Sequence, residues 1–214
     1  EKKLIKSTPK YAPAGQSTQM IVGATGESDR EIMLSANHYY KNYNMKRVYY
    51  SGYVPIRNDP RLPSLGSQVP MLRENRLYQT DWLMRFYGFE VNELLNPQFP
   101  NLDVEVDPKL SWALRNPQHF PVDINRAEKE TLLRIPGVGL KSVSKILNAR
   151  KYRKLNYDHL KAIGVALNRA KYFIICDSRG WETKDLGSAK IKSLILRNSV
   201  GKFRKEYSSQ LSLF

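Results

Sequence analysis

The sequence has a single cysteine, Cys176, and it lacks any long apolar run. One cysteine cannot form an internal disulfide, and it cannot supply the several thiolates of a multi-cysteine metal or iron-sulfur site within this chain. We expect it to fill space in the apolar segment YFIICD. A membrane-spanning helix needs about 20 apolar residues, and no run approaches this length, so a membrane is the weaker expectation and we predict no membrane partner. No signal peptide is recognisable, which favours a cytoplasmic protein.

Acidic side chains are scarce relative to basic ones. The 214 residues include 35 Lys and Arg against 20 Asp and Glu, a formal net charge of +15. Residues 1–115 contribute +3 of this charge and residues 116–214 contribute +12. We therefore expect a polyanionic partner, nucleic acid before an anionic membrane surface, and we expect its site in the second part of the chain.

The first part contains a predicted β-α-β unit. The run TQMIVGA, residues 18–24, is short, apolar and ended by glycine, which is typical of a strand buried in a parallel sheet. Ser28 and Glu31 in SDRE form a predicted capping box that opens a helix to about Tyr43. The β-branched and aromatic run KRVYYSGYVPI, residues 46–56, predicts a second strand. Short connections between the three elements favour parallel pairing.

Turn-rich stretches separate further predicted helices. Residues 57–72 predict a loop, and helices are expected at about 73–87 and 91–95. The segment PKLSWALRN predicts another short helix, and a last one is expected near residues 188–197.

A proline-rich segment, NPQHFP at residues 116–121, marks a predicted domain boundary. We expect one domain over residues 1–115 and a second over residues 116–214. From Val122 onward the pattern predicts helices only, the first with Asn125 as its N-cap.

The stretch LLRIPGVGLKSVSKILNAR, residues 132–150, places Pro-Gly-Val-Gly between two amphipathic segments. Gly137 and Gly139 permit a sharp turn and bring backbone amides close to a ligand. The turn leads into a helix N-terminus, where unpaired N-H groups and the helix dipole attract an anion such as a phosphate. A weaker copy follows 27 positions later, with Gly164 opposite Gly137 and Ala166 opposite Gly139.

These residues resemble the helix-hairpin-helix motif, a sequence-independent DNA-backbone binder, and the resemblance covers about residues 123–175. In the family a cation is sometimes held by hairpin carbonyls, which here implies the region of Ile135, Gly137 and Val138. The alternative interpretation is an ordinary glycine turn in a helical pair, and the positive charge of the segment weighs against it. The DNA-binding residues that the resemblance implies are Pro136, Gly137, Val138, Gly139, Lys141, Ser142, Lys145, Arg150, Gly164 and Arg169.

The stretch MIVGATGESD, residues 20–29, has three interpretations. It is a strand, a turn and a capped helix with no further role, or a phosphate-binding loop, or the edge of a cofactor site. The second fails because neither GxxxxGK[ST] nor GxGxxG is present. The third would use the close approach allowed by glycine together with hydroxyl and carboxylate groups. Its residues are Gly23, Thr25, Gly26, Glu27 and Ser28.

The segments GQSTQMIVGATGESD, RVYYSGYVPI and LRENRLYQTDWLMRFYGF look like the C-terminal half of radical S-adenosylmethionine proteins of DNA modification and repair. In that family a partial parallel barrel is followed by a helix-hairpin-helix region, and a similar glycine segment of lipoyl-synthase-like members runs beside the cofactor. The cofactor-side residues that the resemblance implies are Gln19, Gly23, Thr25, Gly26, Glu27, Ser51, Gly52 and Tyr53, with Arg73, Glu74 and Arg76 as further candidates.

The cluster motif of that family, CxxxCxxC, is absent from the chain. The resemblance therefore implies S-adenosylmethionine and a 4Fe-4S cluster only for a longer protein, whose cluster-binding half precedes Glu1. The polar, basic start that runs at once into a strand agrees with a sequence that begins inside a longer protein. This chain alone is expected to have no metal site and no radical chemistry.

From the sequence we expect an α/β fold, a partial parallel barrel of β-α-β units, followed by an all-α helix-hairpin-helix domain. The leading hypothesis is the C-terminal portion of a radical S-adenosylmethionine DNA modification or repair protein, which docks on duplex or single-stranded DNA and has a repair enzyme as a possible partner. The alternative is a non-catalytic DNA-binding module with an α/β scaffold. An RNA-processing enzyme is a third hypothesis, because backbone contacts distinguish DNA from RNA poorly.

Overall fold

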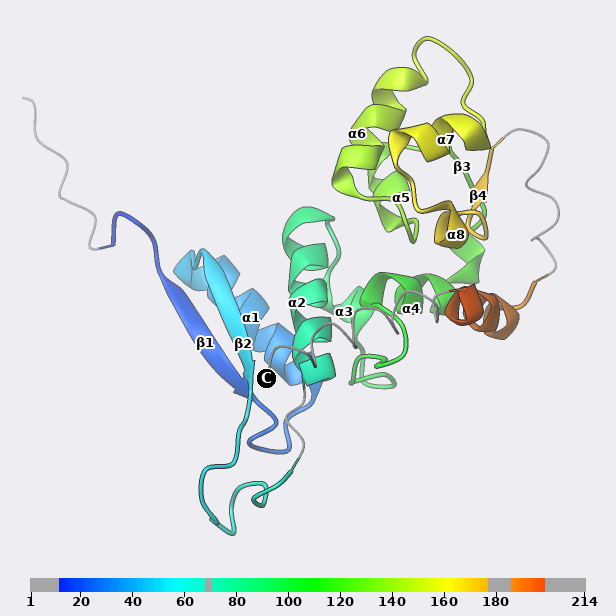
Figure 1. Cartoon of the computed structure of the whole chain (residues 1–214). Coiled ribbons are helices and arrows are strands. Elements are labelled where there is room, and N and C mark those ends of the chain that lie inside the picture. Colours follow the sequence, from blue (N-terminus) through cyan, green and yellow to red (C-terminus); the bar gives the residue numbers. More distant parts are fainter. Residues whose placement is uncertain (1–11, 68–70, 177–185, 199–214) are drawn as a thin grey trace, which may run out of the picture. The chain divides into compact units, whose positions relative to one another are not determined.

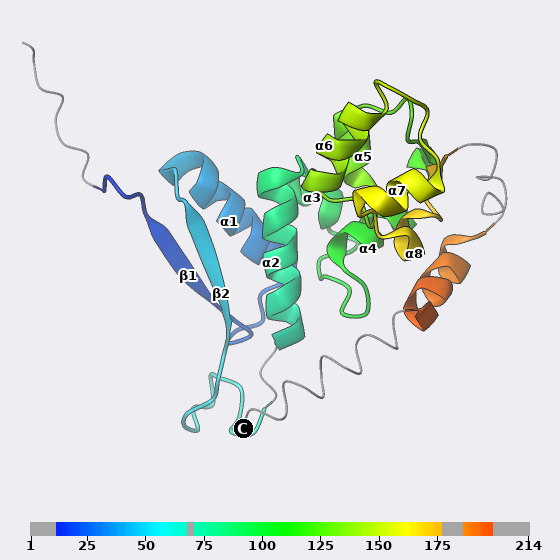
Figure 2. The same ribbon diagram turned by 45° about the horizontal axis from the view of Figure 1, so that its top comes forward.

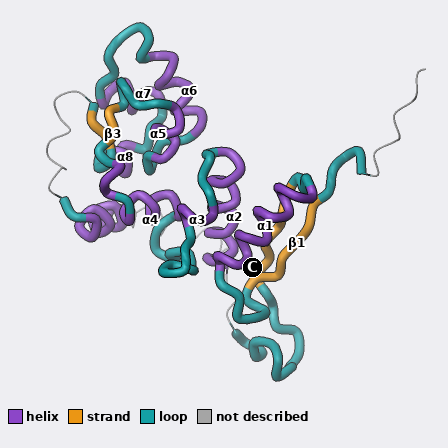
Figure 3. The backbone as a smooth tube through the Cα atoms, turned by 180° about the vertical axis from the view of Figure 1, so that it is seen from behind, coloured by secondary structure: helices purple, strands orange, loops and turns teal. Residues whose placement is uncertain are grey.

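The structure, a computed structural model, describes residues 12–67, 71–176 and 186–198. The fold is mixed α/β and mostly helical, with short parallel strand pairs. Figure 3 shows how little of the described chain is strand. The predicted helix near residues 188–197 is present, since residues 188–198 are helical.

The chain divides into two compact units. Unit 1 comprises Glu1–Asp81 and Leu95–Leu102, and unit 2 comprises Trp82–Leu94 and Asp103–Phe214. The predicted boundary between residues 115 and 116 lies inside unit 2.

Unit 1 is built on the β-α-β unit β1 (Ser17–Val22), α1 (Asp29–Tyr43) and β2 (Arg47–Gly52). The two strands run side by side and are parallel, as predicted, with Val22 opposite Gly52 (Figure 1). Among the described residues this sheet has two strands, so they show a single parallel pair and not the predicted partial barrel.

The helix α1 begins and ends at local sequence signals. The Ser28 hydroxyl accepts a hydrogen bond from the Glu31 amide, and the Glu31 carboxylate accepts one from the Ser28 amide at 2.8 Å, so the predicted capping box is confirmed. The helix ends at Asn44, which takes the left-handed conformation with φ of 49°. Ile32, Met33 and Ala36 form its buried face.

The outer edge of β2 is closed by side chains. The helix α2 (Met71–Phe86) supplies the Tyr78 hydroxyl, which accepts from the Tyr50 amide at 3.0 Å, and the Glu74 carboxylate, which accepts from the Gly52 amide at 2.8 Å. From α1, the Tyr40 hydroxyl accepts from the Val48 amide at 3.0 Å. Three successive outward amides of β2 are thus satisfied without another strand, which ends the sheet on this side.

Unit 2 contains mostly short helices. Besides the helical residues 188–198, its elements in chain order are α3 (Val91–Leu94), α4 (Pro108–Arg115), the 3-10 helix η1 (Pro117–His119), β3 (Val122–Asp123), α5 (Lys129–Arg134), α6 (Leu140–Ala149), α7 (Tyr157–Ile163), α8 (Leu167–Ala170) and β4 (Ile174–Ile175). The pairs α5–α6 and α7–α8 form two helical hairpins that lie side by side (Figure 2). Their buried side chains include Leu132, Ile135, Val143, Ile146 and Leu160.

Two expectations for unit 2 are wrong. The segment from Val122 onward is not purely helical, because β3 and β4 form a parallel pair with Val122 opposite Ile174 and both side chains buried. Asn125 is not an N-cap, because α5 begins at Lys129. The Asn125 amide group instead bonds to the backbone of Leu155 on both sides, donating to its carbonyl at 3.1 Å and accepting from its amide at 2.8 Å. Both features join residues far apart in the sequence, which a local pattern does not reveal.

Candidate functional site

The turn of the first hairpin depends on Gly137. Its φ is +85°, and a Cβ at this position would lie 2.7 Å from the Ala166 carbonyl oxygen. The Ala166 amide donates to the Gly137 carbonyl at 3.0 Å, so the two hairpin turns are joined backbone to backbone. Pro136 before it is buried. The absence of a side chain at Gly137 therefore serves the packing of one hairpin turn on the other.

The second hairpin repeats the backbone of the first with the predicted offset of 27 residues. Gly164 has a φ of +96°, close to that of Gly137. Gly139 is the N-cap of α6, and Ala166 is the N-cap of α8. Val138 of the first turn is buried, as its counterpart in the second turn is. The weaker copy detected in the sequence thus forms a second turn of the same kind, although its following helix has only four residues.

The N-terminus of α6 is open. Gly139 has φ of −102° and ψ of 172°, and no side chain caps the helix within the part of the chain that the structure describes. The first turn contains no acidic residue, and Lys141 in that turn is exposed. The helix dipole and the unpaired amides of the first turn therefore present a positive end, and no described side chain caps it with a counter-charge.

The predicted basic contacts fall into two groups. Lys141 and Lys145 are exposed, and the Lys145 ammonium donates to the Ile163 carbonyl at 3.3 Å beside the second turn. Arg150 instead donates to backbone carbonyls of the segment before α5, the shorter bond being 2.6 Å to Ala127. These two lysines can reach a ligand, whereas Arg150 fixes the end of α6 to its own unit.

Two further predicted contacts also have partners inside unit 2. The Arg169 guanidinium forms an ion pair with Asp107 at 2.5 Å. Ser142 is buried, and its hydroxyl lies 3.5 Å from the Gly164 carbonyl oxygen, directed at the second turn. These side chains support the double hairpin, so an anion at the α6 N-terminus would contact mainly backbone amides and Lys141.

Lys109 is a further residue of this site, and it was not among the predicted site residues. It is buried, its ammonium donates to the Val138 carbonyl at 2.6 Å, and it lies 4.8 Å from the centre of the Tyr87 ring. Burial lowers its pKa to about 7, and the charge of Asp107 opposes this shift only in part. Nothing in the local pattern PKLSWALRN distinguishes this lysine from a surface one. One of the hairpin carbonyls that the resemblance assigns to a bound cation is therefore bonded to an amine of the chain itself.

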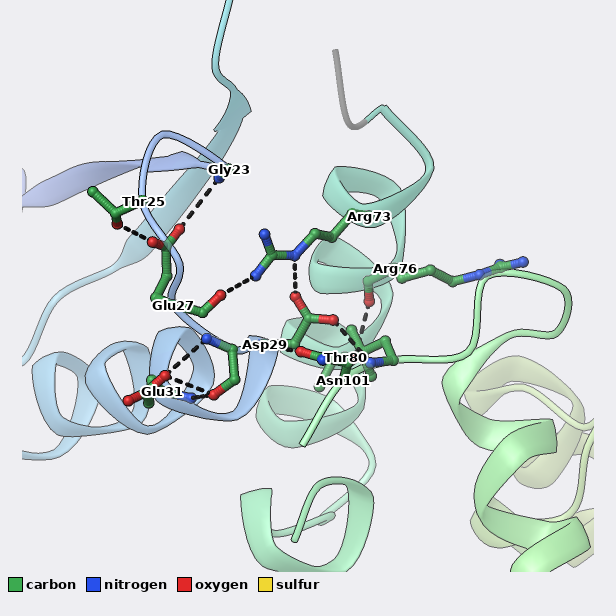
Figure 4. Close-up of polar contacts among 11 residues, drawn as sticks. Gly23, Thr25, Glu27, Asp29, Glu31, Arg73, Arg76, Thr80 and Asn101 are labelled. Atoms are coloured by element: carbon green, nitrogen blue, oxygen red, sulfur yellow. Dashed lines mark hydrogen bonds and ion pairs between the residues drawn. The ribbon is translucent and has the colours of Figure 1, made fainter. Parts of the chain in front are cut away.

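The glycine loop of unit 1 follows the carboxyl end of β1. The Gln19 side chain donates to the Ser51 hydroxyl at 2.9 Å, and the Gly23 amide donates to the Glu27 carboxylate at 3.2 Å. The Thr25 hydroxyl also donates to Glu27 (Figure 4). The structure thus brings together five of the predicted cofactor-side residues, but it pairs them with one another.

The other predicted residues of the loop edge lie nearby. The Tyr53 amide donates to the Val22 carbonyl at 2.8 Å, which places Ser51, Gly52 and Tyr53 beside the start of the loop. A Cβ at Gly26 would meet nothing within 4 Å, so no packing of the described chain requires glycine there.

Glu27 is held in its charged form. Burial acts to raise the pKa of the Glu27 carboxyl, but hydrogen bonds from Thr25 and from the backbone amides of Glu27 and Gly23 together outweigh it. Arg73 adds to the same effect, so the pKa is lowered. The loop therefore contains its own anion.

The start of α1 is anchored by the buried Asp29. Its carboxylate forms an ion pair with Arg73 at 2.5 Å and accepts from the Leu102 amide at 2.8 Å, while its own amide donates to the Asn101 side chain at 3.1 Å (Figure 4). Arg73 also donates to the Glu27 carbonyl at 2.6 Å. Arg73 and Glu74, which the sequence offered as cofactor contacts, thus bond to the backbone and side chains of unit 1.

A metal or cluster site is not supported by the residues described. No group of three or more His, Cys, Asp or Glu is placed to hold a metal ion in the described ranges. Cys176 is buried, and its thiol donates to the Leu155 carbonyl at 3.0 Å, in keeping with the expected packing role. One such thiol does not fit an iron-sulfur cluster.

No helix in the described ranges combines the length and the apolar character that crossing a bilayer requires. Comparisons of this chain with protein-family models, with curated proteins and with solved structures give no match.

Proposed function

We propose that the chain binds the backbone of duplex DNA without sequence preference, with a phosphate at the open N-terminus of α6, in the manner of a helix-hairpin-helix module. The observation that carries the proposal is this helix end, which has Gly139 as its N-cap, no acid in its first turn and no capping side chain from the described residues. A phosphate oxygen can accept from the amides there, and Lys141 adds a charged donor.

The charge around the helix end supports the proposal. Between Glu130 and Asp158 the sequence has seven Lys and Arg residues and no Asp or Glu. Lys141, Lys145 and Lys151 of this stretch are exposed. A surface of one sign attracts a polyanion over a distance, and the affinity should fall steeply as salt is added.

The proposal is tested by closing the helix end with a charge. Gly139→Asp supplies a capping carboxylate at a backbone conformation that any residue adopts, and the nearest atom to a Cβ there is the Tyr87 hydroxyl at 3.6 Å. A cap and a favourable dipole interaction should leave the fold equally or slightly more stable. Duplex DNA affinity, measured by fluorescence anisotropy, should fall roughly ten-fold or more, since a charge-assisted phosphate contact is replaced by repulsion.

The matched control is Gly139→Asn, which caps the helix without a charge. It should bind DNA much more tightly than Gly139→Asp at low salt, and the two should converge as salt rises. Wild-type affinity in Gly139→Asp would overturn the proposal. Tighter binding to an RNA duplex of the same sequence than to DNA would favour the RNA-processing alternative.

We further propose a second function, in which unit 1 is the end of a parallel α/β barrel that binds S-adenosylmethionine beside the Gly23 loop. The supporting observation is the closed edge of β2, whose amides bond to Tyr40, Glu74 and Tyr78. Additional strands could then pair only along β1, the strand nearer the beginning of the sequence. This is the arrangement expected of the last two strands of a partial barrel, which is open at its final strand.

The test of this second proposal is the coding sequence upstream of the Glu1 codon. Three in-frame cysteines spaced CxxxCxxC would support it, because they would supply the thiolates of the cluster that this chain lacks. A start codon directly before Glu1 would contradict this second proposal. In the longer protein, S-adenosylmethionine and the cluster would supply the radical chemistry, and this chain would contribute the loop edge at Gly23 and Ser51.

A further inference from the structure

A groove lies on unit 2 between the C-terminal half of α6, the loop at residues 150–156 and α7. Its volume is about 470 Å³, within the range of about 300–1,000 Å³ that is typical of ligand sites. The residues that line it are Lys145, Asn148, Ala149, Tyr152, Arg153, Leu155, His159, Ala162 and Ile163.

The loop that carries Tyr152 is anchored at both ends. Arg150 is bonded to the segment before α5, and the backbone of Leu155 is bonded on both sides to the Asn125 side chain. The Tyr152 amide donates to the Ala149 carbonyl at 3.2 Å. On this anchored loop Tyr152 is 89% exposed. Among the large apolar and aromatic residues that the structure describes, only Ile56 is equally exposed. An aromatic ring exposed on an anchored loop is available to stack on a flat apolar group of a ligand.

The groove has the chemistry of a nucleotide site. Lys145 and Arg153 give it positive charge, and its lining includes no carboxylate. Ala149, Leu155 and Ala162 are apolar residues of the same lining as Tyr152. A nucleobase has a flat apolar face that stacks on an aromatic ring, and its phosphate carries the charge that lysine and arginine bind.

His159 adds a hydrogen-bond donor at the groove. Its Nδ1 accepts a hydrogen bond from the Asn156 amide at 3.2 Å. The other ring nitrogen, Nε2, therefore carries the proton of the neutral ring and can donate to a base or a sugar.

The groove continues from the proposed DNA surface. Lys145 lines the groove and also bonds to the carbonyl of Ile163, the residue before Gly164 of the second turn. Lys145 is therefore shared between the groove and the proposed DNA surface.

We propose that the groove holds one unpaired nucleotide of a DNA strand whose duplex part is bound at α6, with the base stacked on Tyr152 and the flanking phosphates bound by Lys145 and Arg153. This inference rests on the proposed DNA binding and narrows its substrate to DNA with a duplex next to a single-stranded stretch.

The test compares two DNA probes on the full chain, a blunt duplex and the same duplex with a short single-stranded extension. The wild type should bind the extended probe roughly ten-fold more tightly, about the effect of one base stacked on an aromatic side chain. Tyr152→Ala should lose this preference and keep the affinity for the blunt duplex, whereas Tyr152→Phe should keep both. Arg153→Ala should reduce the preference, and Lys41→Ala, an exposed lysine of unit 1, should not.

A stacking signal gives a second measurement. With 2-aminopurine in the extension, the wild type and Tyr152→Phe should quench its fluorescence, and Tyr152→Ala should not. Equal binding of both probes by the wild type, or an unchanged preference in Tyr152→Ala, would overturn the groove proposal while DNA binding stands. Failure to bind the blunt duplex at all would instead overturn the DNA-binding function on which the groove proposal depends.

Discussion

The helices α1 and α6 both follow a glycine turn, yet their N-termini differ in charge. At α1 the chain supplies its own anions, because Ser28 and Glu31 cap the helix, Asp29 lies in its first turn and Glu27 precedes it. At α6 the cap is Gly139, and the first turn contributes Lys141. A glycine before a helix therefore permits anion binding, but the side chains around it decide whether an external anion is needed.

The largest expected effect comes from a substitution that disrupts the turn before α6. Gly137→Ala should lower the free energy of unfolding of unit 2 by about 3–4 kcal/mol, because its Cβ would lie 2.7 Å from a backbone oxygen and its φ is positive. Gly164→Ala has a similar φ but open space around the Cβ, so it should cost about 1–2 kcal/mol. Tryptophan fluorescence during denaturant unfolding reports on unit 2, which holds Trp82 and Trp112. Equal costs for the two variants would contradict the packing role of Gly137.

The next largest effect is expected from a substitution that removes the Asp29 carboxylate at the start of α1. Asp29→Asn should destabilise unit 1 by about 3 kcal/mol, because it leaves the Arg73 charge without its buried partner. The matched control is Asp59→Asn, whose exposed partner Arg61 lies in the same loop, and its effect should be close to zero. Hydrogen exchange of the unit 1 amides measures both, and similar protection in the two variants would count against the anchoring role of Asp29.

A third effect concerns the lysine beneath the α6 turn. In the unfolded chain Lys109 has its ordinary pKa of 10.5, and in the folded chain burial lowers the pKa to about 7. Between these values the unfolded state binds more protons, so stability should rise with pH from about 7 upward, by at most ~1.4 kcal/mol per pH unit. Asp107 and Tyr87 are the titratable groups beside this amine, and Arg169 pairs with Asp107.

Lys109→Met keeps the length of the side chain and removes its charge. Denaturant unfolding followed by tryptophan fluorescence at pH 7, 8 and 9 should give a flatter pH dependence for this variant than for the wild type. Parallel slopes in the two proteins would show that another group titrates.

The smallest expected effect comes from removing one exposed lysine at the N-terminus of α6. Lys141→Ala should weaken duplex DNA binding by about 1 kcal/mol and lower the slope of log affinity against log salt by about 1, since one phosphate contact is lost. Lys41→Ala on α1 is the control for net charge and should change neither quantity. Identical salt slopes for both variants would place the phosphate contact elsewhere.

Features set by neighbouring residues could be predicted from the sequence. The capping box of Ser28 and Glu31, the parallel β-α-β unit and the 27-residue repeat of the two turns are all confirmed in the backbone. Each is encoded within a short window, by side-chain chemistry at fixed spacing or by glycine at a position of positive φ.

Features that depend on partners far away in the sequence could not be predicted. Asparagine is a residue type favoured at helix N-caps, but the side chain of Asn125 bonds to the backbone of Leu155. Arg150 and Arg169 look like surface cations, but one bonds to backbone carbonyls and the other to Asp107. Lys109 belongs to the site only because the fold brings the Val138 carbonyl to it. A basic residue in a motif indicates charge near the site, and only the fold shows which charges are free to act.

The pairing of β3 with β4 has a mechanical consequence. The two strands are parallel and lie at the beginning and the end of the double hairpin, joined by bonds from Val122 to Phe173 and from Ile124 to Ile175. Tension applied through the chain on either side would pull β3 from its first residue and β4 from its last, along the strands and in opposite directions. Both bonds would then carry the load together in shear, so the pairing of β3 with β4 resists separation of the two hairpins under tension.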